Sequence, residues 1–216
     1  MCYDAVVFDN DGVLTYPTPR SVLRQGVRDA FAEFGVTPDD AVVDGMIDAD
    51  ITRIQQIAER YEIDPAALWA QRESAVAATQ RSALEDGRKT LYADVGTLAE
   101  LDAPLGIVSN NQHETVESIV DRFDLSALFG YATGRPPTLE GFQRRKPQPD
   151  FLEDAVSAIG VDSALYVGDS NVDVLAADRA GLDVAFIRRP HRADYQLVAD
   201  PTYEIESLEE LSAIAV

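Results

Sequence analysis

The stretch AVVFDNDGVLT, residues 5–15, joins an apolar run to a turn that carries two carboxylates. Its first four residues have the composition of a strand that is buried on both faces of a parallel sheet. Asp9 and Asp11 follow at once, and the turn at Gly12 brings both carboxylates into one cleft. They repel each other unless a cation neutralises them, and Mg²⁺ prefers oxygen ligands of this kind. The stretch therefore predicts a strand that ends at a magnesium site, although a strand followed by a plain Asp-Gly turn has the same pattern.

Three more apolar runs have the character of buried strands. They lie at residues 105–108, 164–167 and 184–187. The first runs directly into Ser-Asn at 109–110, and the second into Gly-Asp-Ser at 168–170. Ligands of open α/β sheets bind outside the carboxyl ends of the strands. Together with Asp9, these polar clusters therefore predict one shared site.

Segments with helical periodicity alternate with the strands. They are residues 112–123, 149–159 and 172–180, and the last stops at Gly181, which can take the left-handed conformation of a helix cap. This alternation of strand and helix predicts an α/β fold with a Rossmann-like parallel sheet as its core.

About ninety residues with little strand character separate the first strand from the second. Thr37-Pro38 and Asp64-Pro65 each place a capping side chain before a proline, which is typical of a helix start. The Ala- and Gln-rich stretch 65–84 predicts a long helix. We therefore expect an all-helical cap domain at residues 16–90, inserted after the first motif and covering the site. Residues 1–15 and 91–216 then form the core domain.

The segment 168–173, Gly-Asp-Ser-Asn-Val-Asp, is the second motif that could carry chemistry. Gly168 permits a tight turn after the strand, and Asp169 and Asp173 are one helical turn apart, so they face the same way. A helix that uses Asp or Ser as its N-cap has the same pattern, so the motif alone leaves both interpretations open.

Two further signals indicate an anion site. Ser109 and Asn110 offer a hydroxyl and backbone N–H groups at a junction of strand and helix. Lys146 precedes a Pro-x-Pro helix start and is one of only two lysines, with Lys89. A lysine is a compact phosphate-binding charge that can also keep nearby carboxylates ionised. Alternatively, Ser109 and Asn110 are ordinary capping residues, and Lys146 belongs to a solvated basic loop.

The charge of the chain limits its partners. It has 38 Asp and Glu against 18 Lys and Arg, a net charge of −20, which repels nucleic acid and anionic membranes. No apolar run approaches the roughly 18 residues of a membrane span, and there is no secretion signal, so we expect a cytoplasmic protein. The lysine-poor, diffuse acidity is of the halophilic type and indicates a cytoplasm of very high salt. Unfolding in dilute buffer, reversed by molar KCl, would support that interpretation.

Taken in order, these elements resemble the four motifs of the haloacid dehalogenase-like superfamily. Asp-x-Asp-Gly-x-Leu-Thr at 9–15 is similar to the first motif, and Ile-Val-Ser-Asn at 107–110 to the second. Lys-Pro-x-Pro at 146–149 is similar to the third, and Gly-Asp-Ser-x-x-Asp at 168–173 to the fourth. The resemblance covers nearly the whole chain and is greatest to the phosphoglycolate phosphatase-like subgroup, which has a helical cap.

The resemblance implies a phosphoric monoester hydrolase that acts on a small phosphorylated metabolite. Asp9 would be the nucleophile and form an aspartyl-phosphate, a covalent intermediate. Asp11 would protonate the leaving oxygen and later take a proton from water. The cofactor Mg²⁺ would be held by Asp9, Asp11 through its backbone carbonyl, and Asp169.

By the same resemblance, Ser109, the amide of Asn110 and Lys146 would hold the phosphoryl oxygens. Gly168 and Asp173 would support the site, Asp173 by orienting Lys146 or a metal-bound water. Dehalogenating members of the family lack a second carboxylate at the position of Asp11, so the resemblance favours phosphoryl transfer.

Other functions stay open at this point. A sugar phosphomutase, similar to β-phosphoglucomutase, would pass the phosphoryl group to a sugar instead of water. A phospho-accepting signalling module and a catalytically silent binding protein belong to different classes. Tyr-Pro-Thr-Pro-Arg at 16–20 replaces the acidic or serine-rich stretch common in the subgroup, which leaves the substrate open. The oligomeric state is not readable from the sequence.

Overall fold

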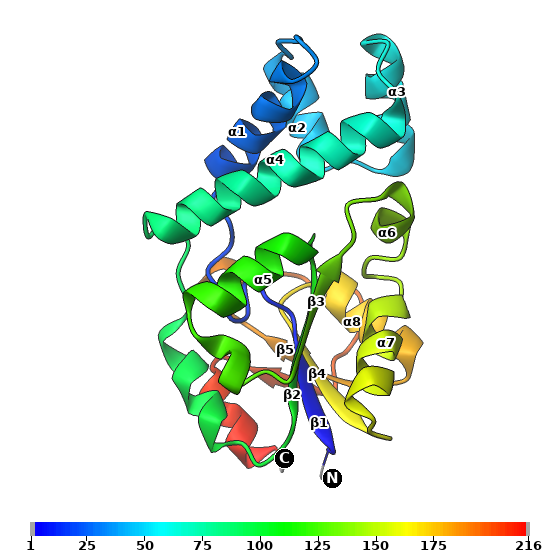
Figure 1. Ribbon diagram of the computed structural model, residues 1–216. Coiled ribbons are helices and arrows are strands. Elements are labelled where there is room, and N and C mark those ends of the chain that lie inside the picture. Colours follow the sequence, from blue (N-terminus) through cyan, green and yellow to red (C-terminus); the bar gives the residue numbers. More distant parts are fainter. Residues whose placement is uncertain (1–2, 215–216) are drawn as a thin grey trace.

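A computed structural model describes residues 3–214 and has a six-stranded sheet at its centre (Figure 1). Every strand pair is parallel, in the order β3-β2-β1-β4-β5-β6. The four predicted runs form β1 (Ala5–Phe8), β2 (Leu105–Gln112), β4 (Ala164–Gly168) and β5 (Asp183–Ile187). The predicted parallel α/β fold is therefore confirmed.

Two edge strands escaped prediction, β3 (Tyr131–Arg135) and β6 (Tyr203–Ile205). Each is partly exposed, because a strand at the edge of a sheet has a neighbouring strand on one side only. Their sequences therefore lack the continuous apolar run that marks the four inner strands.

The strand order brings three strand ends together. The chain builds β1, β2 and β3 in one direction and then crosses back, so that β4 pairs with the other side of β1. The order of the strands thus reverses at β1, and open α/β sheets bind ligands at the carboxyl end of such a switch point. The polar clusters after β1, β2 and β4 all lie at this edge.

Alternate side chains of β1 pack into two apolar layers. Val6 and Phe8 belong to the layer under α5 (His113–Arg122) and the 3₁₀ helices η1 (Ala93–Glu100) and η4 (Leu208–Ala213). Ala5 and Val7 belong to the layer under α7 (Asp150–Ile159) and α8 (Asn171–Ala180). The strand is thus buried on both faces, as its apolar run predicted. Three short helices complete the core: η2 (Leu125–Ala127), α6 (Leu139–Gln143) and η3 (Pro190–Arg192).

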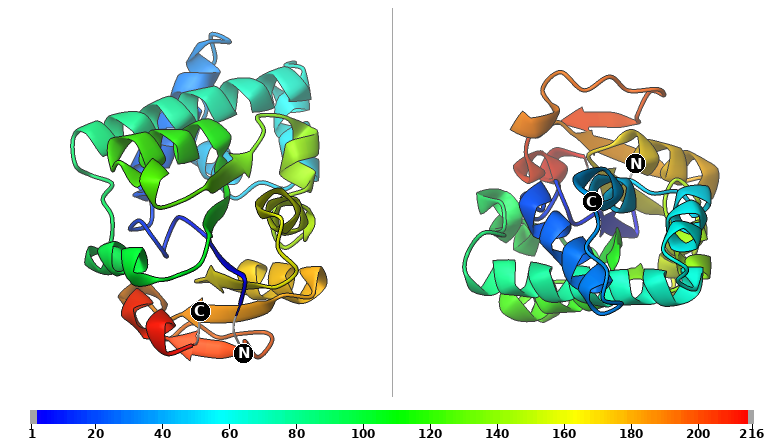
Figure 2. Two further views of the ribbon diagram at one scale, coloured as in Figure 1. Left: turned by 60° about the horizontal axis from the view of Figure 1, so that its bottom comes forward. Right: turned by 90° about the horizontal axis from the view of Figure 1, so that it is seen from above.

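Four α-helices lie between β1 and β2 in the sequence and above the sheet in Figure 1. They are α1 (Arg20–Ala32), α2 (Asp40–Ile47), α3 (Ile51–Arg60) and α4 (Pro65–Glu85). An apolar cluster around Trp69 joins them, and it also includes the buried Phe142 of α6. The long α4 also runs alongside α5 (Figure 2). This cluster supports the proposal that residues 16–90 form a separate cap domain.

The two predicted helix starts had different outcomes. Asp64 caps α4 as expected, since its carboxylate accepts a hydrogen bond of 2.9 Å from the amide of Ala67. The start at Thr37-Pro38 was wrong, because α2 begins at Asp40 and is capped by Asp39. An Asp side chain at this position caps at least as well as Thr and adds a negative charge at the positive end of the helix dipole.

Within residues 3–214, none of the helices combines the length and the apolar character that a membrane span requires.

Candidate active site

Asp9 stands at the carboxyl end of β1, in the middle of the sheet. Its amide donates a hydrogen bond of 2.9 Å to the carbonyl oxygen of Val167 in β4, which fixes the backbone. The side chain is buried, and its Oδ1 lies 2.9 Å from Nζ of Lys146 but has no aligned hydrogen-bond donor among the described residues. Burial raises the pKa of Asp9 to about 7; Lys146 opposes the shift, whereas Asp173 and Asp169 add to it.

Three buried carboxylates meet here. Asp9, Asp169 and Asp173 each offer an oxygen, and these three atoms lie within 4.8 Å of one another. Asp9 and Asp173 share one cation, Lys146, and Asp9 Oδ1 is nevertheless buried without a hydrogen bond. Carboxylate oxygens are hard ligands, and one or two of them are usual at a Mg²⁺ site. The residues present therefore suit the expected metal.

The side chain of Asp11 is not part of this group. Its Oδ1 forms an ion pair with Nζ of the buried Lys89 and accepts a hydrogen bond of 3.1 Å from Thr18, while its Oδ2 accepts one of 2.7 Å from Asn111. Burial acts to raise the pKa of Asp11, but Lys89, Asn111 and Thr18 outweigh it, so that the pKa lies below its ordinary value. A role for Asp11 in metal binding is thus limited to the backbone carbonyl predicted above.

Asp173 is already fully engaged by protein donors. Its Oδ1 accepts hydrogen bonds from Lys146 (2.6 Å) and Tyr166 (3.1 Å), and its Oδ2 accepts from the amide and hydroxyl of Ser170. Such a carboxylate is better suited to position Lys146 than to bind a metal, which is the supporting role predicted for it. Asp9 and Asp169 then remain as the carboxylates that would bind the ion.

Lys146 is buried, and its ammonium is held from several sides. Besides Asp173, its Nζ donates to Tyr166 Oη (2.5 Å) and to the carbonyl of Val108 (3.2 Å). The side chain of Asn110 holds the lysine's backbone, since Nδ2 donates to the carbonyl (2.9 Å) and Oδ1 accepts from the amide (2.8 Å). The predicted role of Asn110 concerned its amide only, and the structure adds this contact of its side chain.

Two glycines allow the turns to approach one another. Gly12 has a φ of 87°, and a Cβ there would collide with the carboxylate of Asp169. A Cβ on Gly168 would collide with the side chain of Asp173. Both positions therefore need glycine for close packing, and Gly12 needs it also for its left-handed backbone.

Asp169 has an arginine and a histidine as neighbours, which no motif indicated. Its Oδ2 lies 2.7 Å from Nε2 of His191 and accepts a hydrogen bond of 2.9 Å from Nε of Arg192, both on η3. Lys89 was equally missed, although its rarity in this chain was a usable signal. The partners of Asp169 and Asp11 come from distant parts of the sequence, where nothing local marks them.

A cavity of about 290 Å³ opens beside Asp9. Its core side includes Asp9, Asp11 and Ser109, whose hydroxyl accepts a hydrogen bond of 3.1 Å from the amide of Asn111. Side chains of α1, α2 and α4 form its other side. The volume is at the lower limit of ligand pockets, so the cavity suits a small molecule.

The raised pKa of Asp9 predicts how the metal-free protein responds to pH. The carboxyl has a pKa of 3.8 when unperturbed and about 7 in the fold. The folded state therefore binds more protons between these values, and stability is lost as the pH rises through this window. Asn cannot ionise, so the free energy of unfolding of Asp9→Asn, relative to wild type, should rise by about 2–3 kcal/mol between about pH 5 and pH 8.

Urea denaturation in EDTA at a fixed salt concentration would measure this difference. Asp102→Asn is the matched control, because Asp102 is exposed near the opposite end of β2 and should leave the pH profile unchanged. Parallel profiles for Asp9→Asn and wild type would show that Asp9 is ionised throughout.

The chain is similar to known proteins in sequence and in fold. The haloacid dehalogenase-like hydrolase profile matches residues 3–181. A phosphoglycolate phosphatase of Cereibacter sphaeroides is 29% identical over 209 residues, covering 87% of this chain and 86% of that protein. An (S)-2-haloacid dehalogenase of Pseudomonas putida is 30% identical over 129 residues, covering 57% of this chain and 55% of that protein. The crystal structure of CbbY from Rhodobacter sphaeroides in complex with phosphate has a similar fold, with a TM-score of 0.72 at 19% identity, covering 97% of this chain and 96% of that one.

Proposed function

The chain belongs to the haloacid dehalogenase-like hydrolase family, and from this premise we propose that it hydrolyses a small phosphate monoester with the help of Mg²⁺. The observation that carries the proposal is the group of three buried carboxylates around Asp9, with Lys146 in contact and a small cavity in front. The similarity to a phosphoglycolate phosphatase makes phosphoglycolate the first substrate to test.

In the proposed reaction, an oxygen of Asp9 attacks phosphorus, and the bond from phosphorus to the ester oxygen breaks. Asp11 supplies the proton of the leaving alcohol. Water then attacks the aspartyl-phosphate, gives its proton to Asp11 and releases inorganic phosphate, so that Asp9 is restored. Bound Mg²⁺ would reduce the repulsion between carboxylate and phosphate. Lys146 and Ser109 would stabilise the negative charge of the transferring group.

The contacts of Asp11 suit one half of this cycle better than the other. Its ion pair with Lys89 keeps the carboxylate ionised, which is the form that accepts a proton from water. Donation to the leaving oxygen needs the protonated form, so the contact with Lys89 has to weaken when substrate binds.

We propose a cytoplasmic enzyme with a small metabolite as its partner. The net charge of −20 favours a small molecule as the partner, because it opposes binding to polyanions.

The test is phosphate release from a panel of phosphate monoesters, measured with Mg²⁺ and with EDTA. We expect turnover that depends on the metal, and no turnover on any ester would contradict the proposal. Formation of an isomeric sugar phosphate without inorganic phosphate would favour the mutase. A stable phosphoprotein without turnover would favour the signalling module.

A further inference from the structure

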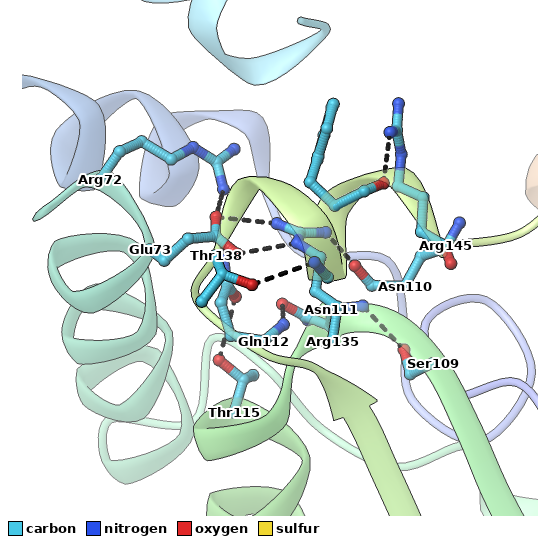
Figure 3. Close-up of polar contacts among 12 residues, drawn as sticks. Arg72, Glu73, Ser109, Asn110, Asn111, Gln112, Thr115, Arg135, Thr138 and Arg145 are labelled. Carbon is cyan, nitrogen blue, oxygen red and sulfur yellow. Dashed lines mark hydrogen bonds and ion pairs between the residues drawn. The ribbon is translucent and has the colours of Figure 1, made fainter. Parts of the chain in front are cut away.

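A second cluster of buried charges lies where α4 meets the end of β3, and it belongs to none of the four motifs. It consists of Arg72 and Glu73 of α4 together with Arg135 of β3 (Figure 3). The three side chains are almost fully buried, at 4%, 1% and 8% exposure. Arg72 and Arg135 line the same cavity as Asp9.

Each guanidinium nitrogen of Arg135 donates a hydrogen bond to the protein. Its Nε and Nη2 bind the two oxygens of Glu73 at 2.7 and 2.8 Å, a bidentate pair, and its Nη1 donates to the carbonyl of Asn110. Glu73 also accepts a hydrogen bond of 3.2 Å from Gln112. Arg135 thus ties α4 to the carboxyl end of β2, and none of its three guanidinium nitrogens lacks a protein partner.

Arg72 has unused capacity. Its guanidinium makes a single hydrogen bond among the described residues, from Nη1 to Glu73, and its buried Nε has no partner. One carboxylate between two guanidinium groups leaves a surplus positive charge, and an uncompensated buried charge is costly. The ring of Trp69, 5.0 Å from the guanidinium, offsets this only in part. Burial lowers the pKa of Arg72; Glu73 opposes this shift, whereas Arg135 adds to it.

We propose that Arg72 binds a second anionic group of the substrate, a carboxylate or a phosphate, while the reacting phosphate lies at Asp9. The inference rests on the proposed function, because it assumes that the phosphoryl group occupies the Asp9 side of the cavity. The planar guanidinium is suited to either anion. With both residues lining one cavity of about 290 Å³, the substrate class is a short molecule with an anion at each end.

A matched pair of substrates tests the inference on the wild-type enzyme. Phosphoglycolate and 2-hydroxyethyl phosphate differ only in a carboxylate that is replaced by a hydroxymethyl group. We expect kcat/KM to be roughly 10- to 100-fold higher for phosphoglycolate, the range of a charge-assisted hydrogen bond. Ethylene glycol bisphosphate provides the phosphate arm, and its ratio to phosphoglycolate shows which anion the site prefers.

Variants then assign the preference to Arg72. In Arg72→Met the preference should disappear, mainly through a higher KM for the doubly anionic substrates, while turnover of 2-hydroxyethyl phosphate persists. Arg72→Lys keeps the charge without the planar fork and should retain part of the preference. Arg81→Met, an exposed arginine of the same helix outside the cavity, should keep all of it.

The outcomes are distinguishable. If wild type turns over both members of the pair equally, or if Arg72→Met slows both alike, the inference is overturned and the proposed hydrolase activity still stands. If neither is turned over with Mg²⁺ while other monoesters on the panel are, the substrate class is wrong. If no ester at all is hydrolysed, the proposed function fails and the inference fails with it. The ratio of kcat/KM for phosphoglycolate to that for 2-hydroxyethyl phosphate is measured on the wild-type enzyme. It therefore tests the inference even if Arg72→Met does not fold.

Discussion

Asp9→Asn is expected to reduce metal-dependent phosphate release by at least about 10⁴-fold, because an amide cannot act as the nucleophile. Asn has the same size as Asp, so the substitution removes only the negative charge that faces Lys146. The fold should therefore survive, with stability in EDTA equal to or above that of wild type near pH 8. Steady-state phosphate release at saturating Mg²⁺ is the measurement, and denaturation of the same preparation shows that the protein is folded.

Asp102→Asn is again the matched control and should retain wild-type activity, since Asp102 is exposed and precedes β2 at the end of the strand opposite the site. Substantial turnover by Asp9→Asn would contradict a covalent mechanism at this residue. In that case water would be the nucleophile, and the proposed metal site would still stand.

Lys146→Met should cause the largest loss of stability of any single change considered for this chain. The buried ammonium is in contact with Asp9, Asp173 and Tyr166, so its removal leaves two buried carboxylates without their cation. Breaking a buried pair in this way typically costs about 3–5 kcal/mol. Urea denaturation in EDTA near pH 8 would measure it, and the loss should shrink near pH 5, where the carboxylates take up protons more readily.

A surface ion pair supplies the comparison. Arg20 is 51% exposed and its partner Asp48 is 66% exposed, so Arg20→Met should change stability by less than about 1 kcal/mol. Both variants need the same salt concentration, because this acidic chain is sensitive to screening. A loss below about 1 kcal/mol for Lys146→Met would mean that Lys146 does not neutralise Asp9 and Asp173 as the geometry indicates.

The parts of the fold that could be predicted are those with local causes. The inner strands are buried on both faces, so their sequences are continuous apolar runs, whereas β3 and β6 at the edges carry no such run. Asp64 and Pro65 predicted the start of α4 correctly, because an N-cap and a first-turn proline stabilise the helix that follows them directly in the sequence. The start predicted at Thr37 was wrong because a second capping residue, Asp39, follows two residues later and caps α2.

The candidate site divides in the same way. The positions of Asp9, Ser109 and Asp169 follow from local sequence, because each comes at or near the end of a predicted strand and parallel strands end at one edge. Which cation meets which carboxylate does not follow. Lys89 pairs with Asp11 across 78 residues, and Arg135 pairs with Glu73 across 62.

Local sequence was therefore enough to predict the parallel α/β core and to place the candidate site at the ends of its strands, while the expected chemistry came from the family resemblance. The ion-pair partners, the free capacity of Arg72 and the shape of the cavity had to come from the three-dimensional arrangement. The physical reason is that strand burial and capping involve neighbours in the chain, whereas these contacts depend on where α4 packs over the sheet. That packing results from many apolar contacts, each small, which no short motif encodes.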